Sequence, residues 1–73
     1  MTFDKVKEIM IDTLNLDDAD ITESATLKDL GVDSIDAVEM IMALEEAFGI
    51  KIGDEEAAKL EKVSDIVRYI DQH

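Results

Sequence analysis

A single serine stands between two aspartates in the segment LGVDSIDAVEM, residues 30–40 of the chain. The acids are Asp33 and Asp36, and an apolar run with helical spacing follows Ser34. A hydroxyl in this setting could cap a helix, act as a catalytic nucleophile, or serve as the attachment point for a group that the chain lacks. Asp and Ser are both preferred N-cap residues, so the capping role is open to Asp33 and Ser34 alike.

The chain lacks the residues that catalysis by a serine nucleophile needs. A serine hydrolase needs a histidine base beside the hydroxyl, and the one histidine is His73 at the chain terminus. The flanking glycines of a nucleophile elbow are missing around Ser34, and the absence of cysteine excludes disulfides, zinc–thiolate sites and thiol catalysis by the chain itself. Attachment stays open, because the N–H groups and positive dipole at a helix N-terminus would stabilise a phosphate ester on Ser34.

The composition is that of a small, acidic, helical protein. Hydrophobic residues make up 47% of the 73 residues, so we expect one domain over residues 1–73 with a core of its own. The 19 acids against 7 bases give a net charge of -12, which repels nucleic acid and anionic membrane surfaces and favours partners rich in Lys and Arg. No apolar run has the length of a membrane span or resembles a signal peptide, and we expect a cytoplasmic monomer.

Apolar periodicity predicts an all-α fold, a small four-helix bundle of three principal helices and one short helix. Thr2 is the expected cap of the first helix, and Ser64 of the last. The first three helices are expected at Phe3–Leu14, Ser34–Phe48 and Asp54–Leu60.

The connection over residues 15–33 shows no sustained period, which is unusual for its length and indicates function or a hidden short element. Its segment TLKDLG predicts a capped turn that Thr26 begins and Gly31 ends. The segment DDADITE has the acids of a calcium loop but lacks the central glycine and the final bidentate glutamate, so no metal site is expected.

The second helix carries two apolar sets when its residues are placed 100° apart. The set expected to face the core is Ala37, Met40, Ile41, Leu44 and Phe48. The other set is Ile35, Val38 and Met42, which share their side of the helix with Glu39, Glu45 and Glu46. Such a helix is either buried all round or presents a docking surface, and we favour docking because unpaired buried carboxylates are costly.

Several segments together resemble one protein family. GVDSID at residues 31–36, ALEEAFGI at 43–50 and DEEAAKL at 54–60 stand in the order found in acyl carrier proteins of bacterial, dissociated fatty acid synthesis, and the resemblance spans essentially the whole chain. It implies that a phosphopantetheinyl transferase esterifies Ser34 with 4′-phosphopantetheine from coenzyme A, and that acyl chains ride as thioesters on the thiol of that arm. Two residues depart from the usual pattern: Ile35 replaces the Leu of the D-S-L core, and Gly53 stands where some relatives carry Pro.

The resemblance also implies roles for other residues of a carrier that is not itself an enzyme. Asp33 would orient the transferase and the Mg²⁺ that it uses. Fatty acid synthesis enzymes with basic docking patches would contact the acids Asp36, Glu39, Glu45 and Glu46 and the apolar side chains Ile35, Val38 and Met42. Asp54 and Glu55 would extend this surface, and the acyl chain would lie against Met40, Leu44 and Ile50.

Two other functions are also compatible with the sequence. A free-standing carrier for polyketide, peptide or D-alanine transfer would share the prosthetic group, since partner enzymes choose the cargo. An unmodified acidic helical adaptor would need no covalent change at Ser34.

Overall fold

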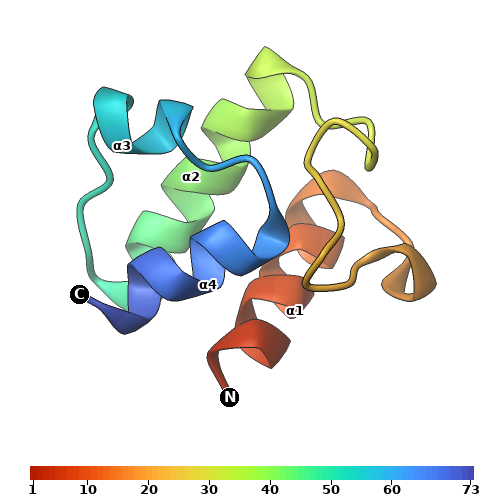
Figure 1. Ribbon diagram of the computed structural model, residues 1–73, viewed down its shortest axis with the longest axis horizontal. Coiled ribbons are helices and arrows are strands. Elements are labelled where there is room, and N and C mark those ends of the chain that lie inside the picture. The colour runs from red at the N-terminus through yellow and green to blue at the C-terminus, as the bar shows by residue number, and fades with distance from the viewer.

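The protein is all-helical in the computed structural model, which describes residues 1–73. Its elements are α1 (Thr2–Leu14), the 3-10 turn η1 (Asp18–Asp20), α2 (Ser34–Phe48), α3 (Asp54–Ala58) and α4 (Val63–Asp71). There is no β-strand, only one isolated bridge between Thr26 and Lys62. These elements confirm the predicted all-α bundle with a long connection between its first two helices (Figure 1).

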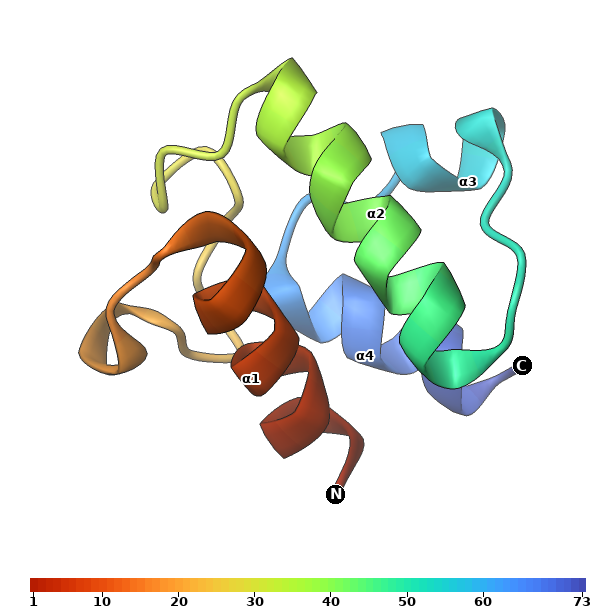
Figure 2. The same cartoon turned by 180° about the vertical axis from the view of Figure 1, so that it is seen from behind.

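The core lies where α1, α2 and α4 meet. α1 packs against both other long helices, and α3 lies on the opposite side of the molecule from α1 in both views (Figures 1 and 2). All the buried side chains are apolar: Val6, Met10, Ile21, Met40, Leu44, Ile52, Val63, Ile66 and Ile70. Full burial of one such side chain stabilises the fold by about 1.5–3 kcal/mol, and partly buried apolar side chains such as Phe3, Ile41 and Phe48 pack against this set.

Two helix ends differ from the prediction. α1 begins one residue early, at Thr2, with Met1 as its N-cap. The Thr2 hydroxyl therefore does not cap α1; it donates a hydrogen bond to the carboxylate of Asp71 in α4, which ties the two helices together. α3 ends at Ala58 rather than at Leu60.

The start of α4 also differs from the prediction. Ser64 lies inside the helix, whose N-cap is Lys62. The first turn is closed instead by Asp65, whose carboxylate accepts the N–H of Lys62 at 3.0 Å and that of Glu61 at 3.1 Å. These two backbone hydrogen bonds, that of Lys62 first, hold the pKa of the Asp65 carboxyl below its ordinary value.

The long α1–α2 connection is held by its own turn and by the α3–α4 connection. The Thr26 hydroxyl accepts the N–H of Asp29 at 3.0 Å, and Gly31 has a φ of +76°, which confirms the capped turn. The Leu27 N–H donates to the Glu61 carbonyl at 2.8 Å. The connection is thus fastened to the segment that precedes α4, and its Leu27 side chain is brought toward α2.

Two further observations concern acids and helix length. Asp18 of η1 forms an ion pair with Lys7 of α1, and nowhere in the chain do three acidic, histidine or cysteine side chains gather closely enough to hold a metal ion. None of the helices combines the length and the apolar character that crossing a membrane requires.

Candidate functional site

Ser34 is the first residue of α2, and Asp33 before it is the N-cap. The Asp33 carboxylate accepts the N–H of Asp36 at 2.8 Å, so the choice that the sequence left open falls on Asp33. The Ser34 hydroxyl is therefore not needed for capping, and the residue is exposed. A hydroxyl in this place can be reached by a partner enzyme without disturbing the helix.

The surroundings of Ser34 suit an attached phosphate. The first N–H groups of a helix have no partners within it, and the dipole of α2 places partial positive charge at this end, worth about 0.3–1 kcal/mol to a nearby anion. The carboxylates of Asp33 and Asp36 oppose an anion by a similar amount, since solvent screens charges at a surface. The attraction of the helix dipole and the repulsion of the two carboxylates nearly cancel. Attachment of a phosphate therefore depends on access to the hydroxyl, and the exposed Ser34 meets this requirement.

The outward side of α2 carries three exposed apolar side chains. Ile35 is 70% exposed, Val38 59% and Met42 62%, which excludes a helix that is buried all round. Glu39 and Glu46 are exposed as well. The apolar set on this side of α2 therefore stands in solvent, as the helical pattern predicted.

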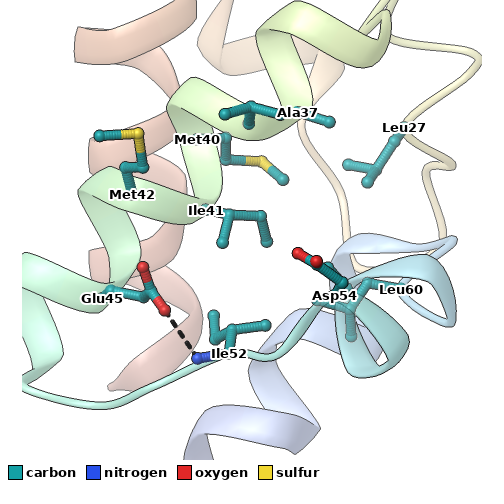
Figure 3. A pocket seen from close by; sticks show the side chains of 11 residues that line it. Leu27, Ala37, Met40, Ile41, Met42, Glu45, Ile52, Asp54 and Leu60 are labelled. Atoms are coloured by element: carbon teal, nitrogen blue, oxygen red, sulfur yellow. Dashed lines mark hydrogen bonds between the residues drawn. The ribbon is translucent and has the colours of Figure 1, made fainter.

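Glu45 lies differently from the other acids of α2. It is half-buried, and its carboxylate accepts the backbone N–H of Ile52 at 2.8 Å (Figure 3). Glu45 follows Ile41 by one helical turn, which places it on the side of α2 that faces the α2–α3 connection. Its side chain therefore joins two parts of the fold, in addition to any contact with a partner.

An apolar pocket of about 270 Å³ lies between α2, α3 and the connections around them. Figure 3 shows Met40 and Ile41 of α2 facing Leu27 and Ile52 on the segments opposite. The apolar lining includes Ala37, Met40 and Ile41 from α2 and Leu27, Ile52 and Leu60 from outside it. Val38 and Met42 line the pocket and are also exposed, so its mouth opens on the same side of α2 as Ile35.

Of the three residues expected to contact an acyl chain, only one lines the pocket. Met40 lines the pocket, whereas Leu44 is buried in the core and Ile50 packs against that core without lining the pocket. Ile52 does line it. The sequence between Gly49 and Gly53 offers two isoleucines, and no spacing rule within so short a segment distinguishes them.

The pocket also has wall residues that the sequence did not indicate as such. Leu27 and Leu60 reach it through the backbone pairing of the α1–α2 connection with the short α3–α4 connection, a contact distant in sequence. Of the two α3 acids expected to extend the docking surface, Asp54 is exposed and borders the pocket, and Glu55 is exposed on the helix beside it.

Comparison with known proteins gives a consistent result. The family model described as "Phosphopantetheine attachment site" matches residues 4–70. The chain is 53% identical to an acyl carrier protein of Clostridium acetobutylicum over 100% of this chain and 96% of that protein. It is 50% identical to that of Wolinella succinogenes and 54% identical to that of Campylobacter jejuni strain RM1221, over 94% and 96% of this chain and 92% of each relative. The exposed serine at the start of α2, the apolar pocket along the same helix and these matches agree: the chain belongs to the acyl carrier protein family, whose prosthetic group is 4′-phosphopantetheine.

Proposed function

We propose that Ser34 carries the 4′-phosphopantetheine arm and that the protein delivers growing acyl chains, held as thioesters, to the enzymes of fatty acid synthesis. The observation that carries this proposal is the exposed Ser34 hydroxyl at the first turn of α2, with the capping role taken by Asp33. The arm supplies a thiol, which the chain lacks because it has no cysteine. The protein itself presents the cargo and catalyses no step.

The residues around Ser34 prepare it for modification. The hydrogen bond between Asp33 and the N–H of Asp36 holds the first turn of α2, and with it the backbone position of Ser34. The exposed carboxylate of Asp33 would guide a phosphopantetheinyl transferase and the Mg²⁺ that it uses. Asp33 would thus stabilise the helix and help the transferase to recognise the serine beside it.

The outward side of α2 is the proposed docking surface. Its apolar part is Ile35, Val38 and Met42, and its acids are Asp36, Glu39, Glu45 and Glu46, with Asp54 and Glu55 extending it. Partner enzymes with basic patches would pair with the carboxylates while their apolar groups cover the exposed side chains. A chain of net charge -12 should attract such patches over several ångströms before contact. We propose that it works as a monomer in the cytoplasm.

The pocket beside α2 is the proposed site for the acyl chain. Its volume of about 270 Å³ is just below the usual range of ligand pockets, and its mouth lies on the docking side of α2. Met40 would contact the chain directly, and Leu44 and Ile50 would support the wall from the core. A chain in this pocket is shielded from water until a partner binds.

Intact-mass spectrometry tests the proposal. The protein is incubated with coenzyme A and a phosphopantetheinyl transferase, and Ser34→Ala is compared with the wild type. Ser24→Ala is the matched control, because Ser24 is another exposed serine of the chain. We expect one phosphopantetheinyl group on the wild type and on Ser24→Ala, and none on Ser34→Ala.

The outcomes separate the competing functions. No gain in mass on the wild type would contradict the carrier function and favour an unmodified adaptor. If the protein is modified, reconstitution with fatty acid elongation enzymes tests the pathway. Modified protein that those enzymes do not use would favour a carrier for polyketide, peptide or D-alanine transfer.

A further inference from the structure

One peptide group in the α2–α3 connection is held at both of its ends. The Ile52 N–H donates to the Glu45 carboxylate at 2.8 Å, and the Lys51 carbonyl accepts from the Tyr69 hydroxyl at 3.0 Å. This N–H and this carbonyl belong to the same planar peptide unit, so the unit cannot turn without straining both hydrogen bonds. Glu45 lies on α2 and Tyr69 on α4, so the peptide is clamped between two helices.

The clamped peptide controls a wall of the pocket. The Ile52 side chain is only 7% exposed and lines the pocket (Figure 3). The connection that carries it has a glycine at each end, Gly49 with a φ of +65° and Gly53 as the N-cap of α3. Glycine bends easily, so the segment between them can move as a strap when the clamp opens.

Few other interactions hold this strap. α3 has only five residues and its N-cap makes no side-chain hydrogen bond. The Tyr69 side of the clamp is itself supported, because the His73 ring stacks on the Tyr69 ring with centroids 4.1 Å apart. The two hydrogen bonds of the clamp are therefore the specific polar contacts that fix Ile52.

We propose that this peptide is the gate of the pocket, and that Glu45 and Tyr69 are positioning residues that set the length of acyl chain it accepts. The inference rests on the proposed function, which places an acyl chain in this pocket. A short chain fits with both hydrogen bonds kept. A longer chain must push Ile52 back, and this breaks both bonds at once.

Amide hydrogen exchange, followed by NMR on the unmodified protein, tests the clamp. Tyr69→Phe keeps the ring and removes the hydroxyl, and we expect the Ile52 amide to exchange roughly fivefold faster, the effect of one lost hydrogen bond. Glu45→Ala should also speed this exchange, whereas Glu45→Gln should stay near the wild type because the amide oxygen can still accept. The Met10 amide in α1 reports global opening and should not change.

The same measurement can overturn the clamp. Equal acceleration at Ile52 and at Met10 would show a merely global loss of stability. Unchanged exchange at Ile52 in Tyr69→Phe would show that the two hydrogen bonds do not act together. Glu45→Gln behaving like Glu45→Ala would assign the effect to the charge of Glu45 rather than to its hydrogen bond.

Acyl loading tests the gate. A phosphopantetheinyl transferase loads the wild type and Tyr69→Phe from butyryl- or decanoyl-coenzyme A. The melting temperatures of the loaded proteins are compared with those of the unacylated holo forms. The decanoyl chain should raise the melting temperature more in Tyr69→Phe than in the wild type, because less of its binding free energy is needed to break the hydrogen bonds of the clamp. The butyryl chain should act equally on both.

Equal decanoyl effects would refute the gate. Failure to load Ser34 would refute the proposed function and the gate with it, while the exchange measurement would still show whether the clamp exists.

Discussion

Replacing Gly53 by proline should stabilise the protein. Gly53 has a φ of -69°, close to the value of about -65° that the proline ring imposes. Its N–H makes no hydrogen bond, so proline removes no backbone interaction. A Cβ on residue 53 would stand 2.4 Å from the carboxylate oxygen Oε2 of Glu56, so this side chain must move. Glu56 is exposed and its side chain can turn away at little cost.

The expected gain comes from the unfolded chain, which loses conformational freedom when glycine becomes proline. Substitutions of this kind at compatible positions contribute about 0.4–1 kcal/mol. For a domain of this size, that corresponds to a rise in melting temperature of roughly 2–8 °C. Thermal unfolding followed by circular dichroism measures it directly, with urea unfolding as a second determination of the free energy of unfolding.

Glu56→Ala provides the control. It removes the obstructing carboxylate, so Gly53→Pro introduced into Glu56→Ala should show the full gain without the cost of moving that side chain. Destabilisation by Gly53→Pro in the Glu56→Ala background would refute the expected gain, because neither a lost hydrogen bond nor the clash with Glu56 would remain to explain it.

Three further predictions concern the core, the docking surface and the start of α4. Leu44→Ala should lower the free energy of unfolding by about 2–5 kcal/mol in urea titrations, whereas Met42→Ala, at an exposed position, should change it by no more than about 0.5 kcal/mol. Similar losses in the two variants would contradict the assignment of the two faces of α2. Glu39→Lys should slow association with a phosphopantetheinyl transferase in surface plasmon resonance, and most at low salt, while the circular dichroism spectrum stays unchanged. An unchanged association rate would remove Glu39 from the docking surface. Asp65→Asn should be less stable than the wild type at neutral pH, because the lowered pKa of Asp65 contributes stability above its unfolded value of 3.8. That contribution is lost as the pH falls through the lowered folded value, so urea unfolding should show the difference shrinking in acid, and a constant difference would rule out the linkage.

The helices, and the position of Ser34 at the start of one of them, could be predicted because they depend on local patterns. The spacing of apolar residues set the range of α2, and its exposed set was visible as a second stripe that the core could not use. The turn at Thr26 and the αL ending of α2 at Gly49 also follow from residues within one or two turns. Local physical chemistry was sufficient for these elements.

What the sequence could not supply depends on the geometry of individual contacts, which residue type and spacing do not fix. Asp65 rather than Ser64 closes the start of α4, because either residue type is able to accept backbone N–H groups there and only the geometry decides. The half-buried position of Glu45 depends on the path of the α2–α3 connection, which brings the Ile52 N–H to its carboxylate. A carboxylate among apolar residues at helical spacing gives no sign of such a partner.

The pocket wall shows the same limit. Leu27 and Leu60 meet there because the α1–α2 and α3–α4 connections pair through their backbones, and backbone pairing leaves no trace in side-chain periodicity. Ile52 rather than Ile50 lines the pocket, and the peptide between Lys51 and Ile52 is hydrogen-bonded to Glu45 and Tyr69, which the sequence of this short segment does not indicate.

Peptide mapping of the modified protein tests the central claim most directly. Trypsin cuts after Lys28 and Lys51, and the peptide between them contains one hydroxyl side chain, that of Ser34. After treatment with coenzyme A and the transferase, this peptide should carry the phosphopantetheinyl group, and fragmentation should place it on Ser34. A group found on any other tryptic peptide, or an unmodified Ser34 peptide under conditions in which a known carrier is fully converted, would contradict the account.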